Sequence, residues 1–383
     1  MATANAPPPP PAANASNPEV PEDANSGCVG TSSEEAGKAS GCEGCPNQSN
    51  CASGEAKRAA EEVRLEVDDA LSGVRQKLLV LSGKGGVGKS TFSAQLAFDL
   101  ASRGHSVGLL DIDICGPSIP LMLGLKGEEV HNSGSGWSPV YVTLPGPGGS
   151  VSMEDENCIA VVSVGFMLPN EDSALIWRGP RKTALIKQFL TDVDWGDIDY
   201  LVIDTPPGTS DEHISIVQYL SSTLKEGDGA VVITTPQEAA MADVRKELNF
   251  CKKTKLNVIG LVENMSGLSL PLTSKLLRLT SRNDKNQVED VTDTMLKKIK
   301  EQLPELLECN FATDIFQPFL GGPEAMAKKF DVPFLGKLPL DTDYLKAGEE
   351  GRPLHEDTVA KNALRSVVDE VLNRTQLAKT GDA

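Results

Sequence analysis

The sequence predicts an α/β fold in which a doubly wound, mostly parallel sheet carries helices on both faces. Apolar strands alternate with helical patterns from about residue 75 onward, which is typical of parallel sheets. A glycine loop stands between an apolar strand and a helical pattern, and polar turns follow later strands. With 383 residues, of which 39% are hydrophobic, the chain is long enough for one large domain with appendages.

The glycine loop reads Gly83-Lys84-Gly85-Gly86-Val87-Gly88-Lys89-Ser90-Thr91, between the apolar run 78–81 and a helical pattern over 91–102. In this context the G-x-x-x-x-G-K-[ST] pattern indicates a P-loop, in which backbone N–H groups and a helix N-terminus hold phosphate. We expect Lys89 to meet the β- and γ-phosphates of a nucleotide, and Ser90 to bind Mg²⁺. Spacing alone leaves Lys84 open, either as a phosphate ligand or as a solvated charge.

Two aspartates follow predicted strands. Asp204 ends the apolar strand 200–203, where a P-loop ATPase keeps a second carboxylate directed at Mg²⁺. Asp113 follows the strand 106–110, at the edge of the sheet where ligands bind in such folds. We expect Asp113 to orient the attacking water, with the capping of a turn before Gly116 as the alternative. The turn at 205–210 is rich in Gly and Pro and suited to sensing a γ-phosphate.

The other expected elements of the ATPase domain, residues 75–377, follow in order. Strands are predicted at 159–163, 230–234, 258–262 and 334–338, and helices at 173–190, 210–220, 237–251 and 357–377. The stretch 268–308 breaks this alternation and contains an amphipathic helical pattern. We therefore predict an inserted surface element there.

Before the ATPase domain the composition changes twice. Residues 1–27, which include five consecutive prolines, predict a disordered tail. Residues 28–54 hold four of the chain's eight cysteines and few apolar residues, and 55–74 form a charged helical linker.

The four cysteines are spaced Cys28-x13-Cys42-x2-Cys45-x5-Cys51. Four thiolates in a segment without a core suit a metal cage that itself supplies the folding energy. Zinc and a [4Fe–4S] cluster both accept four thiolates, and the spacing leaves both open. Disulfides are the third alternative, and a reducing compartment disfavours them.

Charge and composition argue against nucleic acid and membranes as partners of this chain. The net charge of −18 argues against nucleic acid as a main partner, because phosphate binding depends on Lys and Arg. No apolar run approaches the ~18 residues of a membrane span. The first lysine is Lys38, so we find no basic targeting signal and expect a cytoplasmic location.

On these motifs the chain resembles the Mrp/NUBP family of P-loop ATPases, and within it the cytosolic iron–sulfur cluster assembly scaffolds. The resemblance covers nearly everything from Cys28 to Asp341 except the insertion. The runs that carry it are GCVGTSSEEAGKASGCEGCPNQSNCASG, GKGGVGKST, DIDICGPSIP, QFLTDVDWGDIDYLVIDTPPGTSDEH, VENMSG and PEAMAKKFDVPFLGKLPLD.

The resemblance implies a deviant, MinD/ParA-like P-loop in which Lys84 reaches the phosphates of a partner subunit. The partner would be a second copy or a related P-loop ATPase. Asn264, in VENMSG, would contact the purine base. The four N-terminal cysteines would hold a [4Fe–4S] cluster. Slow hydrolysis of ATP with Mg²⁺ would then drive cluster assembly and transfer to cytosolic and nuclear apo iron–sulfur proteins, together with cluster-targeting factors.

The chain departs from the family at one motif. The family carries C-P-x-C after VENMSG, which holds a labile cluster between two subunits. Here Leu306 stands at the place of the first cysteine and Cys309 at the place of the second. Two subunits would offer two thiolates there rather than four, so Cys309 is a bridging-cluster ligand only if other ligands complete the set.

Two other functions are consistent with parts of the sequence. A MinD/ParA-like positioning ATPase would need a basic amphipathic terminus or a basic face, and the acidic chain argues against it. A zinc-clip adaptor would bind nucleotide without turnover. The presence of Ser90, Asp113 and Asp204 argues for turnover instead.

Overall fold

The computed structural model describes residues 24–25, 28, 35–114, 116–134, 136–144, 158–167, 179–209, 211–282, 286–316, 321–356 and 358–375. Nearly all of the predicted tail at 1–27 lies outside these residues. The first part of the helix predicted at 173–190 does so too.

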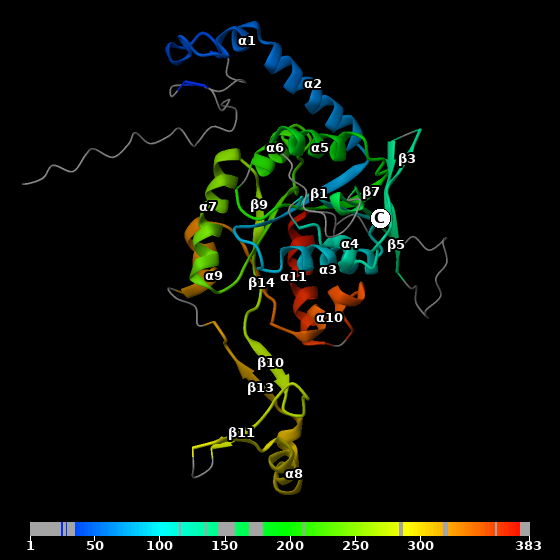
Figure 1. Ribbon diagram of the computed structural model, residues 1–383, viewed down its shortest axis with the longest axis vertical. Helices are drawn as coiled ribbons and strands as arrows, with labels where there is room; N and C mark the ends of the chain where they lie inside the picture. The colour runs from blue at the N-terminus through cyan, green and yellow to red at the C-terminus, as the bar shows by residue number, and fades with distance from the viewer. Residues whose placement is uncertain are drawn as a thin grey trace, which may run out of the picture.

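An eight-stranded sheet forms the centre of the molecule, with the strand order β14-β9-β8-β1-β7-β2-β6-β5 (Figure 1). All neighbouring strands run parallel except the edge strand β5, which is antiparallel to β6. The predicted doubly wound, mostly parallel sheet is therefore confirmed. Its strands are β1 (Val74–Ser82), β2 (Val107–Asp111), β5 (Val140–Thr143), β6 (Cys158–Ser163), β7 (Ile198–Asp204), β8 (Gly229–Thr234), β9 (Val258–Glu263) and β14 (Phe334–Lys337).

Two groups of helices cover the two faces of this sheet, each with its own apolar core. One face packs against α3 (Lys89–Ser102), α4 (Ile119–Met122), α10 (Thr342–Glu350) and α11 (Val359–Thr375). The other packs against α2 (Glu55–Ala70), α5 (Gly179–Thr191), α6 (Asp211–Leu220), α7 (Glu238–Thr254) and α9 (Gly322–Phe330). Every residue of β8 is buried, as expected for a strand covered on both faces.

The helix expected at 357–377 corresponds to α11, and its apolar stripe faces the core with one exception. Leu364, Val367, Val368 and Val371 are buried. Val359, the first residue of the helix, is 52% exposed.

The N-terminal part consists of η1 (Ser40–Cys42), α1 (Gln48–Ser53) and the long helix α2. Beside β5, a small hairpin forms from β3 (His131–Ser133) and β4 (Gly136–Ser138). No helix among the described residues is both long and apolar enough to cross a membrane.

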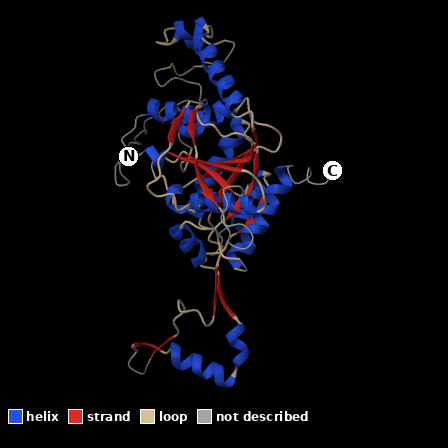
Figure 2. Cartoon of the chain, turned by 90° about the vertical axis from the view of Figure 1, so that its right-hand side faces the viewer, coloured by secondary structure: helices blue, strands red, loops and turns tan. Residues whose placement is uncertain are grey.

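The stretch predicted as an insertion forms a projecting arm, residues 268–313. β10 (Leu268–Pro271) pairs with β13 (Asn310–Thr313) as an antiparallel stalk. Beyond the stalk lie β11 (Thr280–Arg282), β12 (Val288–Asp290), α8 (Thr292–Gln302) and η3 (Pro304–Glu308). The arm extends from the body at the end opposite α1 and α2, as Figures 1 and 2 both show. The expected amphipathic helix is α8, and none of its residues is buried.

Candidate functional site

Polar side chains meet where the central parallel strands end. Strand register sets Asp204, the last residue of β7, beside Asp111, the last residue of β2. Asp111 in turn lies beside Ser163, the last residue of β6. The glycine loop leaves β1 after Ser82 at the same edge. The carboxyl edge of a doubly wound sheet is where ligands bind, so the fold itself gathers these groups.

Lys89 lies at the centre of this cluster. Its Nζ is 2.8 Å from Asp204 Oδ2 and 3.7 Å from Asp113 Oδ2. The Ser90 hydroxyl donates a hydrogen bond to the same Asp204 oxygen at 2.7 Å, and the Ser93 hydroxyl donates to the other oxygen at 2.7 Å. Lys89, Ser90, Asp113 and Asp204, which the sequence singled out, therefore form one buried or half-buried group.

Asp111 belongs to the same group, although the sequence analysis did not assign it a role. Its Oδ1 accepts a hydrogen bond from the backbone N–H of Asp113, and its Oδ2 accepts one from the Ser163 hydroxyl at 2.8 Å. Complete burial, and then the neighbouring Asp204 carboxylate, raise the pKa of Asp111 to about 8. Burial and the Asp204 carboxylate therefore favour the neutral form of Asp111, which limits the negative charge that Lys89 has to balance.

Asn264 lies directly against the glycine loop. It follows β9, and its Nδ2 donates a hydrogen bond to the carbonyl oxygen of Val87 at 2.8 Å. Gly88 has a φ of +86°, and a Cβ built there would come within 2.2 Å of Asn264 Nδ2. Only glycine satisfies both the backbone angle and this close approach.

The rest of the loop is arranged for access from solvent. Lys84, Gly85 and Gly86 are exposed, whereas Val87 is buried in the core under α3. Thr91 lies in the first turn of α3, which begins at Lys89 rather than at residue 91 as predicted. Gly83 packs closely against α7. A Cβ added at Gly83 would come within 2.5 Å of the backbone of Asp243.

The turn after β7 is hydrogen-bonded to β1, the strand that precedes the glycine loop. The Thr205 hydroxyl donates to the carbonyl oxygen of Val80 at 2.8 Å, and the Gly208 N–H donates to that of Ser82 at 2.7 Å. His213, in α6, lies with Nε2 3.2 Å from Thr205 Oγ1. Burial lowers the pKa of His213 to about 4, so the ring is neutral at physiological pH. A ligand that moves this turn must therefore also move α6.

Glu212 lies in the first turn of α6. Its Oε1 accepts a hydrogen bond from Lys182 Nζ at 2.7 Å, which links α6 to α5.

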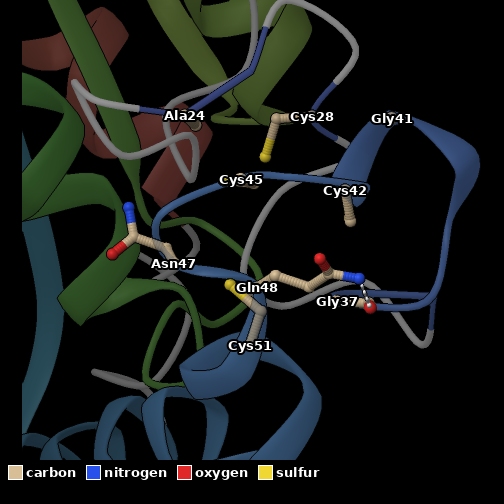
Figure 3. A pocket seen from close by; sticks show the side chains of 9 residues that line it. All are labelled: Ala24, Cys28, Gly37, Gly41, Cys42, Cys45, Asn47, Gln48 and Cys51. Atoms are coloured by element: carbon tan, nitrogen blue, oxygen red, sulfur yellow. Dashed lines mark hydrogen bonds between the residues drawn. The ribbon is translucent and has the colours of Figure 1, made fainter.

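The four N-terminal cysteines line a common cavity at the far end of the molecule. Figure 3 shows Cys28, Cys42, Cys45 and Cys51 around this cavity. Cys42 is buried and the other three are half-buried. The segment turns tightly, since a Cβ at Gly37 would come within 2.4 Å of the backbone nitrogen of Ala52.

The four thiols are close enough to interact as charges. Burial raises the pKa of Cys51, and the thiolates of Cys28, Cys45 and Cys42 raise it further. A bound cation would reverse this effect by favouring the thiolate forms. The cysteines that the structure describes form no disulfide. The donor set therefore fits a group ligated by several thiolates.

Among the described residues, the four sulfurs are not gathered into a preformed site for a single metal ion. Tetrahedral zinc, with Zn–S distances of about 2.3 Å, requires sulfurs about 4 Å apart. Within the described part of the chain, no three His, Cys, Asp or Glu side chains are gathered as closely as the ligands of one metal ion.

Cys309 is far from these four thiols. It is exposed, just before β13 in the arm, with its Sγ 3.8 Å from the carbonyl oxygen of Glu305. α1, which carries Cys51, and β13 lie toward opposite ends of the molecule (Figure 1). One chain therefore cannot bring Cys309 to the four-cysteine segment in this conformation.

Two solved structures of other proteins are similar to this chain. The chain is similar to an ADP-bound nucleotide-binding protein from Archaeoglobus fulgidus in which cobalt was found. The two are 29% identical, with 77% of this chain and 94% of that chain covered and a TM-score of 0.53. It is also similar to the cell division ATPase MinD of Pyrococcus furiosus, at 20% identity, with 78% and 98% of the two chains covered and a TM-score of 0.48.

A family model gives the more specific result. The ParA model, described as NUBPL iron-transfer P-loop NTPase, matches residues 73–304. That range is more than half of the chain, and it contains the glycine loop, both strand-end aspartates beside it and Asn264. The protein therefore belongs to the ParA family of NUBPL-type iron-transfer P-loop NTPases.

Proposed function

We propose that this protein is an ATP-dependent scaffold that assembles [4Fe–4S] clusters and passes them to apo iron–sulfur proteins. Family membership supports nucleotide binding and iron transfer in general. The observation that carries the specific proposal is the cavity lined by Cys28, Cys42, Cys45 and Cys51, outside the family match. It adds a site with four sulfur donors to a nucleotide-binding domain.

In this proposal the residues around Lys89 bind and hydrolyse ATP. Lys89 leaves the Asp204 carboxylate to neutralise the β- and γ-phosphates. Ser90 and Asp204, already hydrogen-bonded to each other, would hold Mg²⁺, which would offset the charge of the phosphates. Asp113, whose Oδ2 lies 3.7 Å from Lys89 Nζ, orients the attacking water. Hydrolysis is slow in a single subunit, because full activity requires a second cation in addition to Lys89.

That cation is Lys84 of a partner subunit. Lys84 is exposed on the loop, and its backbone carbonyl accepts a hydrogen bond from Ser82 Oγ at 3.3 Å. Its side chain is therefore available to a second subunit, either another copy or a related P-loop ATPase. Asn264, next to the loop, contacts the base of the nucleotide. Asn264 also begins the segment that leads into the arm. Nucleotide binding at the glycine loop would therefore change the position of the residues that lead into the arm.

The four cysteines would hold the cluster, which supplies iron and sulfide in transferable form. Cys42 is the most buried of the four, whereas Cys28, Cys45 and Cys51 remain within reach of an acceptor protein. Free thiols require a reducing environment, so we propose a cytoplasmic location. Apo-proteins and cluster-targeting factors are the expected partners, and neither nucleic acid nor membrane is required.

The proposal is tested by cluster transfer. Anaerobic, iron-loaded protein is mixed with an apo [4Fe–4S] dehydratase, and the activity that appears is followed with ATP and Mg²⁺. Wild type should activate the acceptor in an ATP-dependent way. Cys45→Ala should fail to load iron, and Lys89→Ala should load iron but transfer it slowly.

Other outcomes point to other functions. Transfer that is equally fast in Lys89→Ala would show that ATP does not drive it. Zinc in place of iron and sulfide would favour a zinc-clip adaptor. ATP-dependent sedimentation with vesicles or DNA, with no transfer, would favour a positioning ATPase.

A further inference from the structure

The arm carries apolar side chains that nothing in its own chain covers. Among the described residues of the arm, Met295 is 37% exposed, Leu303 is 48% exposed and Val288 is 63% exposed. No residue of α8 is buried, although the helix has a clear apolar stripe. A helix of 11 residues has little stability in water without a packing partner. The arm therefore has the composition of a contact surface.

The arm, residues 268–313, has seven Lys or Arg and seven Asp or Glu, and all of its basic residues lie between Lys275 and Lys300. Between Lys275 and Lys300 there are seven Lys or Arg and four Asp or Glu, whereas the whole chain has a net charge of −18. Lys297, Lys298 and Lys300 of α8 are exposed, and none takes part in an ion pair within the described residues. The partner surface that fits α8 is thus acidic, with an apolar side chain at its centre.

The chain itself contains such a surface on α2. This helix has six Asp or Glu and three Lys or Arg. It packs against the body through Val67, which is buried, while Glu62, Leu65 and Asp69 are exposed. These three share one side of the helix, at positions i, i+3 and i+7. Leu65 is 61% exposed between the two carboxylates.

The two helices cannot meet within one chain. α2 lies at one end of the longest axis and α8 at the other, as both views show (Figures 1 and 2). Two copies related by a twofold axis perpendicular to that axis lie antiparallel, which places each arm beside the α2 of the other copy. The same contact then forms twice, and each supports the other through high effective concentration.

We infer that the arm is a docking element for a second copy of this chain, with α8 packing against the acidic outer side of α2 of that copy. Met295 and Leu303 would cover Leu65, and the α8 lysines would face Glu62 and Asp69. The contact requires neither nucleotide nor iron. If the proposed function also holds, the contact sets the arm, which begins beside the nucleotide loop of one subunit, against the helix that follows the four-cysteine segment of the other.

The test is self-association of the full chain, measured by analytical ultracentrifugation without nucleotide or iron. The α8 variant carries Lys297→Glu and Lys298→Glu, and the α2 variant carries Glu62→Lys and Asp69→Lys. Each alone should weaken association about tenfold or more, because like charges then face each other twice per dimer. Mixed in equal amounts, or combined in one chain, the two changes should restore association to within about threefold of wild type. Raising the salt should weaken wild type and the combined variant alike.

The matched control carries Lys252→Glu and Lys253→Glu, the same charge change on exposed residues of α7. It should associate like wild type. A second variant, in which Asn-Gly replaces residues 273–308 so that the stalk closes as a hairpin, should lose this association while its core unfolds at the wild-type temperature.

Three results would overturn the inference. The first is single variants that associate like wild type. The second is a combined variant that is as weak as either single one. The third is a shortened arm that leaves association unchanged. If the α8 variant instead lost binding to anionic vesicles while self-association stayed intact, the arm would be a lipid-binding element and the inference would also fail. Because ATP and iron are absent, none of these results depends on the proposed function.

Discussion

Replacement of Lys89 by alanine should lower ATP turnover by about 10²–10³-fold or more, because a charge that stabilises the transferring phosphate is removed from a buried site. In the structure this lysine is the cation nearest to Asp204 and Asp113, at 2.8 and 3.7 Å. Without it the Asp204 carboxylate would lose the lysine that lies 2.8 Å from it, and the site would become more negative. We therefore expect weaker nucleotide binding as well as slower turnover.

The loss should be visible in steady-state hydrolysis and in equilibrium titration with a fluorescent ATP analogue. Lys246→Ala is the matched control, since Lys246 is 71% exposed on α7 and pairs only with Asp243 among the described residues. It should hydrolyse ATP at the wild-type rate. Hydrolysis by Lys89→Ala at more than a tenth of that rate would mean that the lysine does not contact the transferred phosphate.

Replacement of Lys84 by alanine should have a different signature. Turnover should fall about 10³-fold, as when a cation supplied by a partner subunit is removed. Nucleotide affinity should change little, because Lys84 is exposed on the outer side of the loop and lies outside the Lys89 cluster. The expected result is therefore a large fall in kcat with an almost unchanged Kd.

Mixing the two variants tests whether Lys84 acts on the partner. A chain with Lys84→Ala keeps Lys89, and a chain with Lys89→Ala keeps Lys84, so a mixed dimer has one complete site. An equal mixture should recover about a quarter of wild-type turnover, since about half of the dimers are mixed and each has one working site. No recovery, in a mixture shown to exchange subunits, would mean that Lys84 acts within its own chain or is a solvated charge.

The sheet could be predicted from the sequence because its strands are buried on both faces. Residues 200–203 of β7 and most of β8 are continuous apolar runs for this reason, and each strand ends in a polar residue at the carboxyl edge of the sheet. The glycine loop was equally clear, because strand, loop and helix follow one another along the chain. All seven parallel strands coincide with predicted runs.

Two helices near the C-terminal end were missed. α9 and α10 each have 9 residues, and too few apolar positions to show a helical period. The sequence of each helix nevertheless contains a residue that is typical of a helix start. Pro323 stands in the first turn of α9, and the Asp341 side chain caps α10 by accepting a hydrogen bond from the N–H of Asp343.

The arm and part of the site depend on contacts between distant segments. The stalk pairs Leu268–Pro271 with Asn310–Thr313, and nothing in either short segment specifies the other. No role was predicted for Asp111, because its place in the site depends on the register of neighbouring strands. Its neighbours Asp204 and Ser163 follow it by 93 and 52 residues. The two aspartates of Asp111-Ile112-Asp113 at a strand end were the available signal.

The account's central claim is that one chain joins a P-loop ATPase to iron held by four N-terminal thiolates. Mössbauer spectroscopy of ⁵⁷Fe-enriched protein, purified without oxygen, tests it most directly, with Cys45→Ala as the loss variant and Cys158→Ser as the control. Wild type and the control should show a [4Fe–4S] spectrum with about four iron atoms and four sulfides per chain, and Cys45→Ala should show none. An unchanged cluster in Cys45→Ala, or wild-type protein that takes up zinc and no iron, would contradict the account.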